Sequence, residues 1–208
     1  MMTRASLEEK LVLRIEAAIV DVTPGVVLRA YAGGQLLCDL RAGQSSAYYD
    51  LASLTKIVFT QQALMQAFDQ GLWRLDTTVG ELLPDFTHGG IRVTELLTHT
   101  SGSTWWMPFY EAVDMRLPWL ERRHWLFAQL KAAPCHNSGK AVYSDLGFML
   151  LGFCLEALYR KNLLEIWHEL RARTYPDSRL AFHVDNVPVF PATQYAATEW
   201  CPWRNKRL

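Results

Sequence analysis

The stretch Asp50-Leu51-Ala52-Ser53-Leu54-Thr55-Lys56 places a hydroxyl and an amine three residues apart at a predicted helix start. Side chains at positions i and i+3 of a helix are neighbours, with about 5–6 Å between their Cβ atoms, so the Lys56 nitrogen can reach the Ser53 oxygen. Ser53 and Lys56 thus have the arrangement of a catalytic nucleophile next to its base. The alternative is an ordinary surface serine and lysine, because Ser-x-x-Lys recurs by chance about once in a chain of this size.

The residues around this pair predict a helix that stops at Gly71. Asp50 is the candidate N-cap, and Gly71 stands where a helix C-terminus favours glycine. The apolar residues between them recur at helical spacing: Ile57, Val58, Leu64, Met65 and Phe68. With Ser53 in the first turn, the free N–H groups and partial positive charge of the helix start favour a negative atom beside its oxygen.

Composition and charge exclude several classes of partner. A chain of 208 residues with 50% hydrophobic content can bury a core as one domain or two small ones. The 21 basic and 21 acidic residues cancel, so the chain lacks the electrostatic footprint of a nucleic-acid or anionic-membrane binder. We therefore expect a small-molecule partner, no nucleic acid and no membrane.

The cysteines and apolar runs indicate a reduced, cytoplasmic protein. Cys38, Cys135, Cys154 and Cys201 form no C-x-x-C pair, so we expect free thiols, no metal site and no cofactor. Residues 1–20 lack the uninterrupted apolar core of a signal peptide. The longest apolar run, residues 146–155, is shorter than the roughly 20 residues that a membrane span needs.

The N-terminal part predicts a helix followed by a β-hairpin. Ser6-Leu7-Glu8-Glu9 fits a capping box before an amphipathic run that Pro24-Gly25 ends. Residues 26–32 and 35–41 read as strands, and Gly33-Gly34 can supply the positive φ values of a tight turn. A two-stranded hairpin is marginal alone, so this one needs further strands or a helix layer.

Two later stretches carry polar side chains beside predicted helices. Residues 93–102 predict a short helix that runs into a glycine turn, and we interpret His99 there as a structural hydrogen-bonding group rather than a ligand. Tyr143-Ser144-Asp145 precedes an apolar helix over residues 146–153, which Ser144 or Asp145 would cap. A further helix is predicted over residues 163–173.

Four tryptophans lie in a stretch that also holds Pro108 and Pro118: Trp105, Trp106, Trp119 and Trp125. Such rings can line a cleft or fill a core. We expect most of them to fill the core.

Three separated stretches together resemble the serine β-lactamase and penicillin-binding-protein-like family, nearest its class C and esterase-like branch. They are residues 51–56 (Leu-Ala-Ser-Leu-Thr-Lys), 96–102 (Leu-Leu-Thr-His-Thr-Ser-Gly) and 142–147 (Val-Tyr-Ser-Asp-Leu-Gly). They occur in the family's order, and the resemblance runs from about Pro24 to the C-terminus.

The resemblance implies a mixed α+β fold of the β-lactamase/transpeptidase type. Residues 1–50 would be the first, incomplete part of an antiparallel-sheet domain, and residues 51–208 the active-site helix and a mostly helical domain, with the site between the two. Ser53 would be the nucleophile, Lys56 its partner and Tyr143 the phenolic base. Asp145, where many members have Asn, and Trp105 are the candidate substrate-binding residues.

The family's third motif, a Lys-Thr-Gly or His-x-Gly triplet on a late strand, is not found before Leu208. The resemblance thus implies a C-terminally truncated member with an uncovered sheet edge, through which copies of the chain can self-associate. One oxyanion donor would be the Ser53 N–H and the other would come from the missing strand. Loss of one such donor typically costs about 10²–10³ in rate.

Two functions follow from this resemblance. The first is a serine hydrolase, impaired by the missing motif, that forms an acyl-enzyme from a small ester, a β-lactam or a D-Ala-type peptide. The alternative is a catalytically inactive truncated remnant or interaction fragment. For the enzyme, Lys56 or Tyr143 must lower its pKa by about three units to act as a base at pH 7, which costs about 4 kcal/mol.

Overall fold

The computed structural model describes residues 4–19, 21–136, 139–182, 189–201 and 206–207. The chain divides into two compact units, Met1–Leu51 with His183–Leu208, and Ala52–Phe182. The predicted boundary at residue 50 falls beside the division after Leu51. The described residues 189–201 and 206–207 belong to the same unit as the N-terminal residues, and the domain division expected from the sequence stays a prediction.

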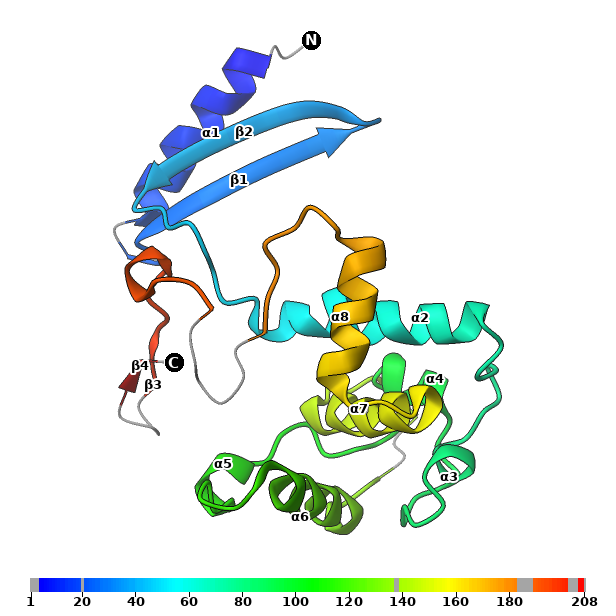
Figure 1. Ribbon diagram of the computed structural model, residues 1–208. Coiled ribbons are helices and arrows are strands. Elements are labelled where there is room, and N and C mark those ends of the chain that lie inside the picture. The colour runs from blue at the N-terminus through cyan, green and yellow to red at the C-terminus, as the bar shows by residue number, and fades with distance from the viewer. Residues whose placement is uncertain (1–3, 20, 137–138, 183–188, 202–205, 208) are drawn as a thin grey trace. The chain divides into compact units, whose positions relative to one another are not determined.

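The first unit is built on a helix and a hairpin (Figure 1). Helix α1 (Arg4–Ile19) lies along the antiparallel strands β1 (Gly25–Ala32) and β2 (Gln35–Gly43). Gly33 and Gly34 have φ values of 54° and 77°, so the predicted tight turn is confirmed. The register shifts after Ala30, where β2 carries one extra residue as in a β-bulge.

The C-terminal part of this unit joins the segment that precedes residue 52. Tyr48 forms a bridge with Tyr195, and its ring stacks on Phe190 with centroids 3.8 Å apart. A 3-10 turn (Ala192–Gln194) and the short paired strands β3 (Trp200–Cys201) and β4 (Lys206–Arg207) follow. Within the described ranges, β1 and β2 pair with each other and with no third strand.

The second unit begins with one helical run of changing pitch. A 3-10 turn (Ala52–Leu54) leads into a π-helical turn (Lys56–Gln61) and then α2 (Gln62–Asp69). Gly71, with φ of 71°, follows as the predicted stop. The run starts two residues after Asp50, so the predicted N-cap does not directly precede its first residue.

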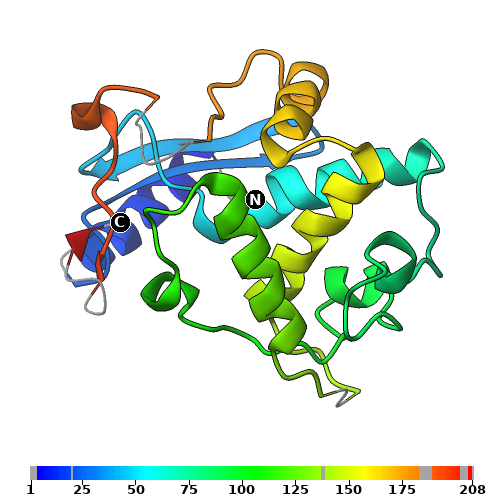
Figure 2. The ribbon, with the colours of Figure 1, turned by 60° about the horizontal axis from the view of Figure 1, so that its bottom comes forward.

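Most of the remaining helices of this unit contact α7 (Asp145–Tyr159), whose apolar sequence accounts for its central place. It packs against the π-helical turn and against α2, α6 and α8, and Figure 2 shows α6 beside it. The other helices are α3 (Val79–Leu82), α4 (Val93–Leu97), α5 (Phe109–Ala112), α6 (Trp119–Ala132) and α8 (Leu163–Thr174). The predicted helices near residues 93 and 163 are thereby confirmed.

The expectation that most of the four clustered tryptophans fill the core is wrong. Trp105 and Trp119 are 62% and 58% exposed, and Trp106 and Trp125 are half-buried. Trp105 and Trp106 lie on the mostly irregular backbone between α4 and α6, which offers no continuous helix face to bury their rings, and Trp119 is the exposed first residue of α6. The core instead takes Trp73 and Trp167.

Among the described residues, none of the four cysteines forms a disulfide. None of the helices in the described ranges combines the length and apolar character needed to cross a membrane. The architecture is the mixed α+β arrangement expected from the sequence, with a small antiparallel sheet and a helical unit.

Replacement of Leu151 by alanine tests the central place of α7. Leu151 is fully buried, so we expect Leu151→Ala to lower the free energy of unfolding by about 2–5 kcal/mol. Met149 lies on the same helix with 36% exposure, and Met149→Ala should change it by less than about 0.5 kcal/mol. Urea unfolding followed by circular dichroism measures both, and equal losses would contradict the packing described.

Candidate functional site

The Ser53–Lys56 pair lies at the irregular start of the helical unit. Ser53 is in the 3-10 turn, and Lys56 is the first residue of the π-helical turn. Turns with π-helical geometry are rare in proteins as a whole, but many of those that occur lie at functional sites. Ala52, directly before Ser53, has a left-handed φ of 43°, which is uncommon for a residue with a side chain. In this backbone, Lys56 Nζ lies 3.0 Å from Ser53 Oγ and donates to it.

Lys56 also contacts the start of α7. Its Nζ donates to Asp145 Oδ1 at 2.7 Å, although the two residues are 89 positions apart. The side chains are 17% and 33% exposed, so this is a partly buried ion pair rather than a surface one. An ion pair of this kind holds both side chains in place, because separating them would leave an uncompensated charge in a partly buried position.

The cap of α7 fixes where Asp145 stands. Ser144 is almost fully buried; its Oγ accepts from the Gly147 N–H at 3.0 Å and donates to the Thr104 carbonyl at 2.7 Å. The Asp145 N–H donates to the Trp105 carbonyl at 2.8 Å. Of the two predicted caps, Ser144 is therefore the one that closes the helix.

His99 braces the same segment from the end of α4. Its Nδ1 accepts from the Ser144 N–H at 3.0 Å, and its carbonyl accepts from the Val142 N–H at 2.8 Å. Burial lowers the pKa of His99, and the charge of Lys56 lowers it further against the opposing effect of Asp145. A neutral imidazole that accepts a backbone hydrogen bond fits the structural role expected for His99.

Aromatic rings flank the lysine. The Tyr143 ring centroid lies 5.0 Å from Lys56 Nζ and the Phe148 centroid 5.7 Å, which are cation–π distances. Tyr143 is half exposed and packs on His99, with centroids 4.6 Å apart. Trp105 is more exposed and lies beside Trp106, with centroids 5.8 Å apart.

The surroundings of Lys56 stabilise its charged form. Burial by itself lowers the pKa of Lys56, but the hydrogen bonds to Asp145 and Tyr143 and the charge of Asp145 outweigh it, so the pKa lies above its ordinary value. The base invoked from the sequence needed a shift in the opposite direction. In this structure Lys56 is therefore an ammonium group that donates to Ser53.

All the residues singled out from the sequence fall in one neighbourhood. Hydrogen bonds connect Ser53, Lys56 and Asp145, while Tyr143 and Trp105 adjoin them through a ring contact and a backbone hydrogen bond. Phe148 was missed, although its position three residues after Asp145 on a predicted helix was a signal for a shared face. Within the described ranges, no group of three or more His, Cys, Asp or Glu side chains could hold a metal.

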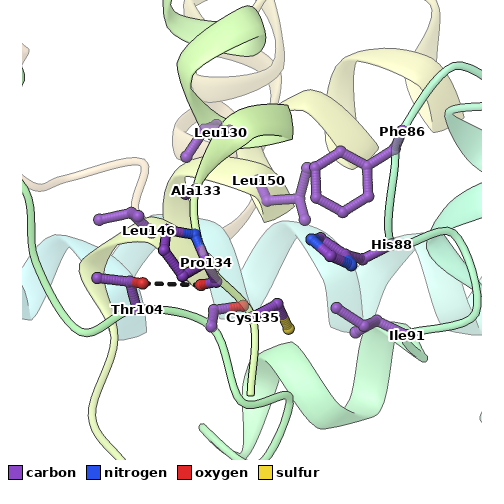
Figure 3. Close-up of a pocket in the computed structure, with 11 residues that line it drawn as sticks. Phe86, His88, Ile91, Thr104, Leu130, Ala133, Pro134, Cys135, Leu146 and Leu150 are labelled. Carbon is purple, nitrogen blue, oxygen red and sulfur yellow. Dashed lines mark hydrogen bonds between the residues drawn. The ribbon is translucent and has the colours of Figure 1, made fainter. Parts of the chain in front are cut away.

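A small cavity lies elsewhere in the same unit (Figure 3). It has a volume of about 20 Å³, room for about one water molecule. Thr104 and Pro134 face it, joined by a hydrogen bond of 2.7 Å. None of Ser53, Lys56, Tyr143 and Asp145 lines it, so the cavity does not hold the reacting groups.

Comparison with known proteins places the chain in a family. The family model described as Beta-lactamase matches residues 12–187. The N-acetylmuramyl-L-alanine amidase of Bacillus subtilis (strain 168) is 31% identical over 185 residues, which cover 82% of this chain and 41% of that protein. A protein of Escherichia coli (strain K12), provisionally named D-alanyl-D-alanine carboxypeptidase, is 24% identical over 182 residues, covering 82% and 42%.

Solved structures agree on the fold. A D-stereospecific amidohydrolase from Streptomyces sp. is 28% identical with a TM-score of 0.59, over 77% of this chain and 51% of that one. A β-lactamase/D-alanine carboxypeptidase from Pseudomonas syringae is 20% identical with a TM-score of 0.68, over 96% and 57%. The chain spans less than half the length of the two curated relatives above.

The charge of Lys56 can be tested by replacing its partner. In Asp145→Asn we expect the pKa of Lys56 to fall, because burial then acts with less opposition. The pair stabilises the fold fully below the ordinary lysine pKa and loses this effect as the pH rises through the raised value. Titration of ¹³Cε-labelled lysine by NMR, assigned with Lys56→Arg, measures the shift.

The exposed Lys161–Glu169 pair supplies the control. Glu169→Gln removes the carboxylate that pairs with Lys161, a lysine of the same unit, and should leave the pKa of Lys56 unchanged. A Lys56 pKa that stays the same in Asp145→Asn would contradict the role given to the ion pair.

Proposed function

Because the chain belongs to the beta-lactamase family, we propose that it is a serine hydrolase that forms an acyl-enzyme on Ser53. The observation that carries the proposal is the Lys56 ammonium, 3.0 Å from Ser53 Oγ and 2.7 Å from Asp145 Oδ1. A hydroxyl held by a cation has its lone pairs oriented and its developing negative charge stabilised. An ordinary surface serine has no use for either effect, so the contact favours a nucleophile over a surface residue.

The proposed reaction is acyl transfer from an amide or ester. Ser53 Oγ attacks the carbonyl carbon while its proton passes to a base, which is either the Tyr143 oxygen or Lys56 Nζ, each after it has lost its own proton. The bond to the leaving group breaks as a proton reaches the leaving atom, and water then hydrolyses the Ser53 ester. The Ser53 backbone N–H, in the first helical turn, is the proposed first oxyanion donor.

The relatives favour an amide substrate. One is named for an amidase and another for a D-stereospecific amidohydrolase, so we propose a small amide or a related ester for this chain. Asp145 and Trp105 are the proposed substrate-contacting residues, because Asp145 is partly exposed beside Lys56 and the exposed Trp105 is joined to Asp145 by a backbone hydrogen bond. The cytoplasmic location and the reduced rate expected from the sequence stay predictions.

Labelling tests the identity of the nucleophile. We expect a fluorophosphonate or a penicillin to add one acyl or phosphonyl group per chain at Ser53, since this hydroxyl alone combines exposure with the Lys56 contact among the described serines. Intact-protein and peptide mass spectrometry locate the adduct. Ser53→Ala should abolish labelling and keep the stability, whereas Ser45→Ala, at another exposed serine, should label like the wild type.

Turnover of an activated ester completes this test. Hydrolysis lost in Ser53→Ala and retained in Ser45→Ala supports the enzyme. Adducts on another residue, or hydrolysis independent of Ser53, would overturn it and favour the non-catalytic alternative.

We also propose that copies of the chain associate through the hairpin edge. In the described residues no third strand pairs with β1 or β2, and Val27 and Tyr31 on β1 are 40% and 60% exposed. Unpaired strand edges are templates for pairing with another chain, and a lysine on the edge opposes it.

Light scattering after size exclusion tests the edge. We expect a concentration-dependent increase in mass that Val27→Lys reduces. Leu13→Lys, which adds the same charge on α1 at a residue 68% exposed, should leave the association intact. Equal effects of the two variants would show that the edge is not the interface.

A further inference from the structure

Asp145 presents a carboxylate to the space beside the nucleophile. Its Oδ1 accepts from Lys56 Nζ at 2.7 Å, while its Oδ2 has no hydrogen-bond partner among the described residues. The side chain is one-third exposed, so solvent or a substrate can reach it. An ionised carboxylate only accepts hydrogen bonds, so its natural partner on a substrate is an N–H group, above all a charged one.

The same carboxylate restrains catalysis while it holds Lys56. Lys56 can accept a proton from Ser53 only after losing its own, and this would leave the Asp145 charge without a partner in a partly buried place. The other titratable groups facing Lys56 in the described residues are Tyr143 and His99. His99 accepts a backbone hydrogen bond at Nδ1, so it does not supply a cation in its place.

Building on the proposed function, we propose that Asp145 makes the site selective for acyl donors that carry a primary ammonium group on the carbon next to the scissile carbonyl. Such a cation can take the place of Lys56 as the partner of the carboxylate. Asp145 and Ser53 each hydrogen-bond to the same Lys56 nitrogen, so a group bound to Asp145 lies within a few atoms of Ser53 Oγ. The amine next to a carbonyl fits this spacing.

Binding and activation are then one event. When the substrate ammonium pairs with Asp145, Lys56 releases a proton to water and its neutral Nζ can accept another. Nζ takes the proton of Ser53 Oγ as Oγ bonds to the carbonyl carbon. The bond to the leaving group breaks as this proton passes to the leaving atom, and the substrate ammonium keeps its protons throughout.

A pair of substrates that differ only in charge tests the selectivity. Alanine p-nitroanilide has a free amine and N-acetylalanine p-nitroanilide does not; each is used as both enantiomers. We expect kcat/KM to favour the free amine by about 10- to 100-fold, as for a hydrogen bond to a charged group. Asp145→Asn should remove this preference and Asp145→Glu should retain it. Asp114→Asn, at an aspartate paired with Arg116, should behave like the wild type.

Binding to Ser53→Ala separates this inference from the proposed function, because the variant cannot form the acyl-enzyme. With ¹³Cε-labelled lysine, alanine p-nitroanilide should lower the pKa of Lys56 on binding, and the N-acetyl compound should not. That result supports the inference whether or not the chain turns substrate over. Equal responses to the two compounds, no response to either, or a free-amine preference that survives in Asp145→Asn would overturn it.

Discussion

The ion pair between Lys56 and Asp145 is the contact that makes one site out of two distant sequence motifs. It joins the first helical turns of the Ala52–Phe182 unit to the start of α7, 89 residues later. Because both side chains are mostly shielded from water, each charge depends on the other, and displacement of one element would leave a charge without compensation. The same pair decides that Lys56 donates to Ser53 rather than accepting its proton.

Ser144 and His99 position this pair through hydrogen bonds and take no part in the proposed reaction. Ser144 closes α7 and ties it to the Thr104 carbonyl, while His99 accepts from the Ser144 backbone. The loop after α4 thus supplies hydrogen-bond acceptors to the residues at the start of α7, and these bonds fix the position of Asp145. Helix starts in general offer free N–H groups, and here a serine side chain and a carbonyl satisfy those next to the site.

Much of this arrangement was predictable because its signals are local. The Gly33-Gly34 turn, the stop at Gly71 and the apolar run of α7 each depend on a few neighbouring residues. The exposure of Trp105 was not predictable, since burial of a ring depends on the backbone that carries it. Helix α6 was also missed, although Pro118 at its start and Glu121 in its first turn are start signals. The charge of Lys56 depends on its contact with Asp145, 89 residues away in the chain. The sequence spacing of two residues so far apart does not tell whether they lie close together in the fold.

The central claim is that Asp145 sets the proton affinity of Lys56 and, through it, the reactivity of Ser53. The rate of Ser53 acylation by an activated, amine-free ester, measured in single turnovers across a range of pH, tests this most directly. The account predicts a rate that rises with pH in the wild type and does so at lower pH in Asp145→Asn, because the lysine there loses its proton more readily. Coincident pH profiles for the two proteins, at equal stability, would contradict it.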